Sequence, residues 1–334
     1  MTEQCGPQPG RASPEQLAVR NAVRTALVDL APGSLVLVAC SGGPDSSALA
    51  AAVAFAAPRS GLRAGAVVVD HGLQAGSAMV AAATAGWLAD VGMDPVEVVR
   101  VEVDRAGGPE DGARRARYAA LAIAAERTGA TAVLLGHTRD DQAETVLLGL
   151  ARGSGARSLS GMRQVRGIYR RPLLALARST VHAAIDPGAP VVHDAHNDDP
   201  AFARSRVRAT VLPVLEGQLG PGVTAALART ADLLRADADA LDDWSARVHE
   251  QLGTDPAAGL VVEELAALPA AVRTRVLRRA AIAAGVPPGP LSAAHIAALD
   301  SLVTAWRGQR GPSLPGGVSA ERRCGRLTLR AAAG

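Results

Sequence analysis

Six residues near the N-terminus have the types and spacing of an anion-binding loop: Ser41-Gly42-Gly43-Pro44-Asp45-Ser46. The apolar run 35–40 before them has the length of a buried strand, and an alanine-rich helical pattern follows over 48–57. A strand that leads into a helix through such a turn directs the helix's free N–H groups, and the positive end of its dipole, at whatever lies above the turn. Phosphate is the usual ligand there. A serine–glycine turn that merely caps a helix is the alternative.

The glycines of this loop let a ligand approach the main chain and permit backbone conformations that other residues avoid. Asp45 places a carboxylate beside the anion site, where a bound cation would suit it. The loop is neither of the two common nucleotide-binding patterns, because no Lys follows the glycines and the Gly-x-Gly-x-x-Gly spacing is absent.

Polar residues also follow two further apolar runs of strand length. Asp70 and His71 come at the end of the run 63–70, and His137 to Asp141 follow the run 131–136. Ligands of parallel sheets bind beyond the carboxyl ends of the strands, so we expect these groups and the loop to form one site. Asp70 and His71 could bind a nucleotide there or hold a loop by hydrogen bonds.

Two charged pairs on expected helices could also do chemistry. Asp141 and Glu144 are three residues apart, so both carboxylates can face one side of a helix. There they could hold Mg²⁺ or the ammonium groups of an amino substrate, although acids in a first helical turn are also favoured by the helix dipole alone. Arg114 and Arg117 likewise share a helix face, which suits phosphate oxygens or is simply a solvated basic surface.

Short apolar strands alternating with amphipathic helices predict a doubly wound, mostly parallel α/β sheet, followed by a smaller, mainly helical C-terminal domain. The expected strands cover 35–40, 63–70, 94–103 and 131–136. The expected helices of the first part cover 14–30, 48–57, 77–91, 111–128 and 140–151. In the second part, helices are expected over 221–252, 262–268, 270–284 and 292–306, and a short hairpin over 316–330.

The overall composition narrows the class of protein. The chain has no Lys, so all 35 basic residues are Arg, and the net charge is only +3. A polyanion site must therefore come from local clustering, and residues 151–180 hold seven Arg without one acid. Three cysteines far apart argue against a disulfide scaffold, a zinc site or an iron–sulfur cluster. Neither a signal peptide nor a membrane span is visible, which predicts a cytoplasmic protein.

The loop Ser41–Ser46 resembles the Ser-Gly-Gly-x-Asp-Ser loop of the ATP-pyrophosphatases, which split ATP into AMP and pyrophosphate. Three more segments extend the likeness: Val69-Asp-His-Gly-Leu73, Ala113-Arg-Arg-Ala-Arg-Tyr118 and Gly136-His-Thr-Arg-Asp-Asp-Gln-Ala-Glu-Thr145. In this order and spacing, over roughly residues 33–215, they are similar to the tRNA(Ile)-lysidine synthetase family. Two departures occur further on, where His196 and Ser205 replace the usual Ser and Asn.

The resemblance implies that ATP adenylates the wobble cytidine (C34) of a tRNA(Ile) with a CAU anticodon, after which L-lysine displaces AMP to give lysidine. It implies that ATP is bound by the loop with Asp70 and His71, that Asp45 lies near Mg²⁺, and that Asp141 and Glu144 bind lysine. Arg114 is expected beside the reacting phosphate or base. The catalytic group would then be Asp45, Arg114, Asp141 and Glu144. The expected tRNA contacts are Arg152, Arg157, Arg204 and Arg208.

The same resemblance gives the expected domain organisation. Residues 1–13 would form a disordered tail, 14–216 the ATP-pyrophosphatase catalytic domain and 217–334 a helical tRNA-binding domain, and a homodimer is a further expectation. Three alternatives stand beside this function: a sulfur-inserting tRNA enzyme of the same superfamily, an amidotransferase-type synthetase, and a nucleotide-binding protein without catalysis. The first commonly needs reactive cysteines, the second a source of ammonia, and the third would have lost its acids.

Overall fold

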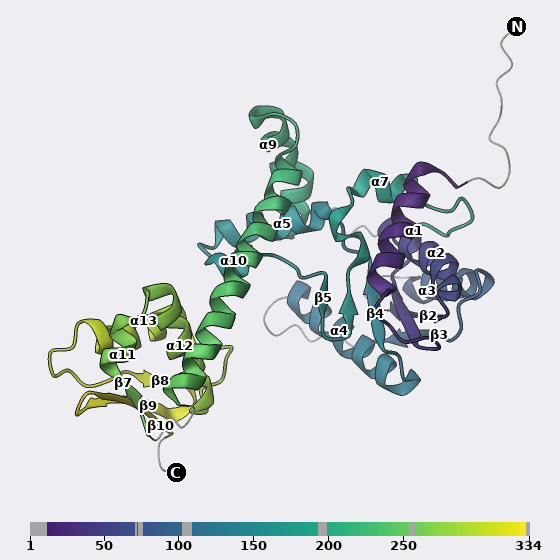
Figure 1. Ribbon diagram of the computed structural model, residues 1–334. Helices are drawn as coiled ribbons and strands as arrows, with labels where there is room; N and C mark the ends of the chain where they lie inside the picture. The colour runs from purple at the N-terminus through teal and green to yellow at the C-terminus, as the bar shows by residue number, and fades with distance from the viewer. Residues whose placement is uncertain are drawn as a thin grey trace, which may run out of the picture. The chain divides into compact units, whose positions relative to one another are not determined.

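The computed structural model describes residues 12–70, 72, 76–101, 109–192, 199–253 and 258–331, with the side chains of 109–111 left aside. The chain forms two compact units, Met1–Leu233 and Leu234–Gly334 (Figure 1). The boundary between them along the chain falls within the 30-residue helix α10 (Val223–Leu252). The predicted domain boundary at 216/217 stays a prediction, and residues 1–11 of the expected tail lie outside the described residues.

The first unit is built on a six-stranded sheet in the order β3-β2-β1-β4-β6-β5. All neighbours pair in parallel except β5 and β6, so the predicted doubly wound, mostly parallel sheet is confirmed. The order reverses between β1 and β4, and such a switch point is where these sheets bind ligands. The strands are β1 (Leu35–Cys40), β2 (Arg63–Asp70), β3 (Val96–Arg100), β4 (Ala132–Leu135), β5 (Val165–Arg166) and β6 (Tyr169–Arg170).

Helices cover both faces of this sheet (Figure 1). Alternate side chains of β1 point to opposite faces. Val36 and Val38 therefore pack in one core with α1, α2 and α3, whereas Leu35 and Leu37 pack in another with α4. At the start of α1, Ser13 and Gln16 form a capping box. The helices are α1 (Pro14–Leu27), α2 (Pro44–Arg59), α3 (Ser77–Asp90), α4 (Pro109–Thr128) and α5 (Arg139–Ala151).

After the sheet, the first unit continues through short helices that the sequence pattern did not predict. A π-helical turn, η3 (Val207–Val211), joins α8 to α9. Pro213 lies just beyond it and cannot donate the hydrogen bond that an α-helix would make to the carbonyl of Ala209, which gives the π turn its physical reason. The remaining elements are α6 (Ala156–Leu159), η1 (Pro172–Ala175), α7 (Arg178–Ala183), α8 (Ala203–Arg206) and α9 (Leu212–Leu219).

The second unit packs helices against a small antiparallel sheet of order β7-β10-β9-β8. The three predicted helices and the predicted hairpin β9–β10 are present, and the two-residue strands β7 and β8 enlarge that hairpin to a four-stranded sheet. The bounds are α11 (Val262–Ala267), α12 (Ala270–Ala283), α13 (Ala293–Thr304), β7 (Leu260–Val261), β8 (Ser313–Leu314), β9 (Val318–Arg323) and β10 (Arg326–Ala331).

In the described part of the chain, no helix is both long enough and apolar enough to cross a bilayer. The cytoplasmic location stays a prediction.

Glu216 gives the first unit a measurable acid sensitivity. Its carboxylate accepts hydrogen bonds from the backbone N–H groups of Thr224, Gly222 and Val223 at the start of α10, and these bonds lower its pKa from 4.5 to about 2. A carboxyl group with a depressed folded-state pKa stabilises above its unfolded pKa and loses that contribution as pH falls towards the folded value. Glu216→Ala should therefore lower the melting temperature at pH 7, and the gap to wild type should narrow below pH 4.5.

The matched control is Gln218→Ala, because Gln218 lies in α9 like Glu216 but cannot titrate. Thermal unfolding of the three proteins between pH 7 and pH 3 checks the prediction. A gap between wild type and Glu216→Ala that is as large at pH 3 as at pH 7 would contradict it.

Candidate nucleotide site and its acid–arginine network

The loop after β1 is held open by its own hydrogen bonds. Ser46 Oγ accepts from the Ser41 backbone N–H at 3.2 Å and donates to the Gly43 carbonyl at 2.9 Å. Gly42 has φ +78°, and a Cβ there would lie 2.8 Å from Thr84 Oγ1, so only glycine fits. Helix α2 begins at Pro44, and among the described residues no side chain caps it. Its first N–H groups are therefore available to an anion, as the sequence predicts.

Gly136, directly after β4, lets the end of that strand pack against the start of α2. A Cβ at this position would lie 3.1 Å from the carbonyl carbon and oxygen of Asp45 and 3.2 Å from Cα of Ser46. The contact is with backbone, which cannot move aside as a flexible side chain can. In the sequence, Gly136 is part of a motif but has no role of its own. The only local sign of its importance is that a glycine ends a buried strand.

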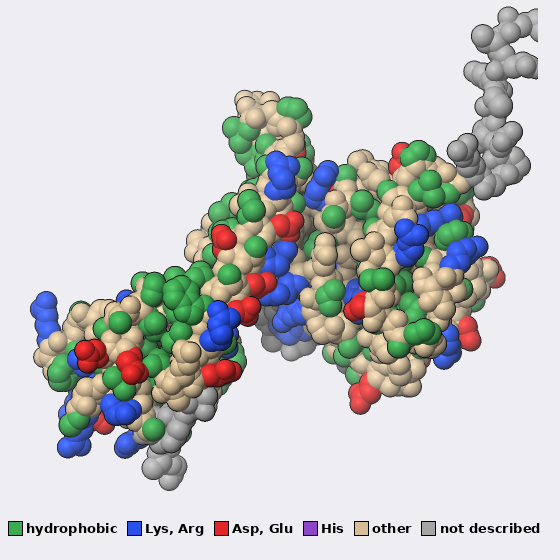
Figure 2. All heavy atoms as spheres, in the orientation of Figure 1, with side chains coloured by type: hydrophobic (Ala, Val, Ile, Leu, Met, Phe, Trp, Pro, Cys, Tyr) green, Lys and Arg blue, Asp and Glu red, His purple; other side chains and the backbone are tan. Residues whose placement is uncertain are grey.

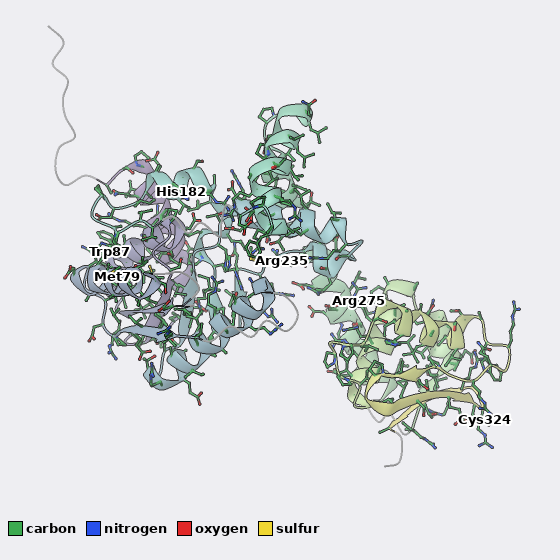
Figure 3. The ribbon with its side chains drawn as sticks, turned by 180° about the vertical axis from the view of Figure 1, so that it is seen from behind. Met79, Trp87, His182, Arg235, Arg275 and Cys324 are labelled. Atoms are coloured by element: carbon green, nitrogen blue, oxygen red, sulfur yellow. The ribbon has the colours of Figure 1, made fainter. Side chains whose placement is uncertain are left out.

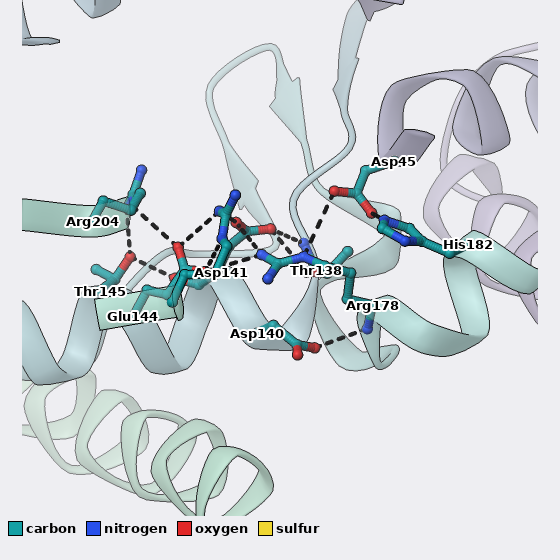
Figure 4. A network of polar contacts seen from close by, with 10 residues as sticks. Asp45, Thr138, Asp140, Asp141, Glu144, Thr145, Arg178, His182 and Arg204 are labelled. Carbon is teal, nitrogen blue, oxygen red and sulfur yellow. Dashed lines mark hydrogen bonds and ion pairs between the residues drawn. The ribbon is translucent and has the colours of Figure 1, made fainter. Parts of the chain in front are cut away.

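Asp45 lies where the loop meets positive charge. Its carboxylate is 3.2 Å from His182 Nε2 and 3.9 Å from Arg178 Nε (Figure 4). Figure 3 shows His182 from behind, on helix α7. Oδ1 of Asp45 is buried and makes no hydrogen bond to any described residue. Burial, and next the repulsion of Asp141, raise the pKa of Asp45 despite Arg178. An added cation would relieve this carboxylate.

These residues fit Mg²⁺ in one particular way. The described residues hold no cluster of three His, Cys, Asp or Glu side chains that could bind a metal ion on their own. Mg²⁺, however, is commonly held by one or two carboxylates together with water and substrate phosphates. Oδ1 of Asp45, next to the anion-binding loop, is a donor of that kind, because it accepts no hydrogen bond from a described residue and has only the contact with His182 Nε2.

Asp141 and Glu144 do face one side of α5, as predicted, and both are buried. Asp141 Oδ2 accepts from the backbone N–H and the hydroxyl of Thr138 at 2.7 and 2.8 Å, which caps the helix. Burial alone would raise the pKa of Asp141, but Arg178 and the Thr138 bonds outweigh it and lower that pKa. Asp141 is thus held as an anion inside the protein.

Three arginines surround these two acids (Figure 4). Arg178 Nη2 lies 3.0 Å from oxygens of both Asp141 and Glu144. Arg208 contacts the same two side chains, with its Nε 2.7 Å from Glu144 Oε1. Arg204 Nε is 3.4 Å from Glu144 Oε2. Together with Asp45 the network contains three carboxylates and three guanidinium groups, so its charges balance before any ligand is bound.

A second basic cluster lies around Tyr118. The Tyr118 hydroxyl accepts from Arg171 Nη2 at 3.1 Å, and the guanidinium carbon of Arg114 lies 5.0 Å from the centre of its ring. His137 is near this cluster, and burial, then the charge of Arg117, lower its pKa to about 3. It is therefore a neutral imidazole at pH 7. Arg114 is exposed, and its charge also contributes to the lowered pKa of His137.

The remaining predicted site residues are placed as follows. Asp70 is buried, and its Oδ1 accepts from the N–H of Gly72, so it holds a loop, which was one of its two predicted roles. His71 and His196 lie outside the described residues, and Ser205 is buried in α8. Arg204 and Arg208, predicted to contact tRNA, have Glu144 as a partner.

Not all seven arginines of the run 151–180 are available to a polyanion, contrary to what the sequence suggests. Arg170 and Arg171 are buried: Arg170 bonds Asp29 and the Ala26 carbonyl, and Arg171 bonds Tyr118 and the Arg163 carbonyl. They are part of the internal structure, because a guanidinium group can satisfy several acceptors at once. The exposed arginines of the run are Arg152, Arg157, Arg163 and Arg166.

Gln142, to which the sequence pattern assigned no role, holds α5 in place. The side-chain amide of Gln142 pairs with the backbone of Met162, accepting from its N–H at 2.7 Å and donating to its carbonyl at 3.1 Å. Gly161, with φ +61°, leaves the room for this amide. Gln142 thereby ties α5 to the loop that precedes β5.

Comparison with known proteins agrees with this geometry. A family model described as a PP-loop domain matches residues 16–215, and a second, described as a TilS substrate binding domain, matches residues 260–328. The U34-tRNA thiolase NcsA of Methanococcus maripaludis has a similar structure, with a TM-score of 0.53 and 18% identity over 66% of this chain and 79% of that one. At this identity the likeness concerns the fold alone. The fold and the loop define a PP-loop protein.

Closer relatives give the family. The tRNA(Ile)-lysidine synthase of Thermobifida fusca is 60% identical over 95% of this chain and 98% of its own length. That of Streptomyces coelicolor is 60% identical over 89% and 85%, and that of Salinispora tropica 53% over 95% and 96%. The chain belongs to the tRNA(Ile)-lysidine synthase family, and the resemblance found in its motifs is confirmed.

The close approach at Gly136 can be tested by adding one methyl group. Gly136→Ala should displace the backbone of Asp45 and Ser46 and lower kcat/KM for ATP by roughly 10- to 100-fold, because small misplacements of binding groups are costly. Steady-state kinetics with ATP as the varied substrate measures this. Gly86→Ala in α3 is the control, because a Cβ there meets nothing within 4 Å. Equal kinetics for both variants and wild type would contradict the assigned role of Gly136.

Proposed function

We infer that this chain is an ATP-dependent ligase that forms lysidine at the wobble cytidine of tRNA(Ile), releasing AMP and pyrophosphate. The observation that carries this inference is the 60% identity with a tRNA(Ile)-lysidine synthase over 95% of the chain. The geometry agrees with it. An anion-binding loop follows β1, and a network of acids and arginines lies at the ends of β1 and β4, where a parallel sheet of this kind binds its ligands.

In the first half-reaction, the C2 oxygen of the cytidine attacks the α-phosphorus of ATP, and pyrophosphate leaves. The N–H groups at the start of α2 and the hydroxyls of the loop would bind phosphate oxygens, as helix N-termini do. Arg114, exposed beside Tyr118, is our candidate for the cation at the reacting phosphate or base. Adenylation makes C2 electrophilic and gives it a good leaving group.

In the second half-reaction, the side-chain amine of lysine attacks C2 and AMP leaves. We propose that the acid–arginine network holds the other end of the amino acid. Its mixed charges suit a zwitterion, with the α-ammonium on Asp141 and Glu144 and the α-carboxylate on Arg204 or Arg208. Because the network is already balanced, a ligand that brings one charge of each sign leaves it balanced.

Mg²⁺ is proposed at Asp45. When bound, it would neutralise charge on the phosphates and on the departing pyrophosphate. Oδ1 of Asp45 supports this assignment, because it is buried, accepts no hydrogen bond from a described residue and has only the ion-pair contact with His182 Nε2 at 3.2 Å. Arg178, shared between Asp45 and the two acids of α5, would orient both groups of side chains.

Sulfur insertion gains no support from the described cysteines. Burial raises the pKa of the Cys40 thiol, which disfavours the reactive thiolate. Cys324 belongs to the second unit, at the turn between β9 and β10 (Figure 3). L-lysine as substrate, the CAU anticodon, a homodimer and a cytoplasmic location remain proposals. Arg152 and Arg157 are exposed and remain our candidates for tRNA contacts in the first unit.

Transfer of labelled lysine tests the function directly. With ATP and Mg²⁺, purified protein should label a tRNA(Ile) transcript with a CAU anticodon and release one AMP per lysine, and a C34→U transcript should stay unlabelled. Release of AMP without label in the tRNA would mean that another nucleophile is used. No AMP release with either transcript would favour the non-catalytic alternative.

Two charge-neutralising variants should separate the two substrates. Glu144→Gln should raise KM for lysine by about 10- to 100-fold, the value of a hydrogen bond to a charged group, with little change in KM for ATP. Asp45→Asn should raise KM for ATP with Mg²⁺ by a much larger factor than KM for lysine, which it can reach only through the shared Arg178. Thermal unfolding of both variants controls for loss of the fold. If both variants changed the two constants in the same proportion, the division of roles would be wrong.

A further inference from the structure

Trp306 forms an open aromatic surface in the second unit. It follows the end of α13 and is 43% exposed. The guanidinium carbon of Arg322 lies 4.7 Å from the centre of its ring. Arg322 is itself fixed, because its Nη1 donates to the carbonyls of Leu302 at 2.6 Å and Val303 at 3.3 Å. The indole is thus held from one side by an immobilised cation while much of its surface stays open.

The segment around this tryptophan is strongly basic. Residues 301–331 contain Glu321 as their one acid and six arginines: Arg307, Arg310, Arg322, Arg323, Arg326 and Arg330. Arg322 and Arg326 are bound to backbone carbonyls. The side chains of the other four are exposed and bond to no residue that the structure describes. Figure 2 shows basic side chains projecting from this unit.

The other exposed tryptophan has acidic neighbours in the sequence. Trp244 is 41% exposed, but Asp242 and Asp243 precede it directly in α10. Of the aromatic residues in the described part of the chain, only these two are exposed. Asp242 is paired with Arg275, so the surface around Trp244 offers no excess of open cations, and a polyanion should prefer the surface around Trp306.

We propose that Trp306 stacks on an unpaired nucleotide of the tRNA and that Arg307 and Arg310 bind the phosphates next to it. The proposal rests on the proposed function, since it names a contact of that substrate. An exposed ring face accepts any base, and guanidinium groups beside it hold the backbone, which is how single-stranded nucleic acid is commonly bound. A base within a duplex has no free face, so the nucleotide must be unpaired. The match of residues 260–328 to a substrate binding domain supports this surface.

The test measures binding of the tRNA(Ile) transcript to the full chain, with Trp244→Ala as the matched control. Trp306→Ala should raise Kd by about 5- to 100-fold, the range for loss of one stacked base. Trp306→Phe, which keeps a ring, should recover most of that loss, and Trp244→Ala should bind like wild type. KM for ATP and lysine should not change in any of these variants.

A second variant does not depend on Trp306 packing. Arg307→Gln combined with Arg310→Gln removes two cations that contact no described side chain, and it should reduce the slope of log K against log salt by about 2. If the double variant and Trp306→Ala both bound tRNA like wild type, while wild type made lysidine, this inference would be wrong and the proposed function would stand. If Trp306→Ala melted early, the salt slope of the double variant would decide. If wild type made no lysidine, the proposed function would fail. The binding data would still decide whether Trp306 contacts the tRNA.

Discussion

A single buried carboxylate organises the functional half of the first unit. The side chain of Glu144 is completely buried, and a charge in that position is tolerated only when it is paired and hydrogen-bonded. Its partners are Arg178 of α7, Arg204 of α8 and Arg208 of the π turn, the last of them 64 residues further along the chain. These ion pairs therefore hold the short helices that follow the sheet against α5.

The same network connects the two halves of the proposed chemistry. Arg178 lies 3.9 Å from Asp45 of the anion-binding loop and 3.0 Å from both acids of α5. A cation bound at Asp45 would weaken the hold of that carboxylate on Arg178 and leave the arginine more firmly on Asp141 and Glu144. Occupation of the nucleotide side would thus alter the charge balance on the side proposed for lysine. The close packing of Gly136 on the loop keeps these groups within reach of each other.

The sequence predicted the structure best where a periodic apolar segment ends in polar residues. The four long strands, their helices and the convergence of loop, Asp70 and Asp141 at one edge all follow from local patterns and from the rule for parallel sheets. The partners of the acids could not be found in this way, because ion pairs across 34 to 67 residues leave no periodic trace. Strands of two residues, such as β5 and β7, are too short to show an alternating pattern. The π turn depends on one proline whose effect is set by tertiary context.

The number of arginines in a segment is a poor guide to nucleic-acid binding in this chain, for a physical reason. The arginine-rich run 151–180 looks like a nucleic-acid surface, but Arg170 and Arg171 bind the protein itself. The arginines of α12 (Ala270–Ala283) show the same behaviour. Arg273 pairs with Asp300, and Arg278 bonds the carbonyls of Leu291 and Pro288. A planar fork of five donors satisfies such groups well, and a chain without lysine must use arginine for every cationic task. Affinity for RNA should therefore follow the few guanidinium groups that stay open, such as those beside Trp306, and not the 35 arginines of the sequence.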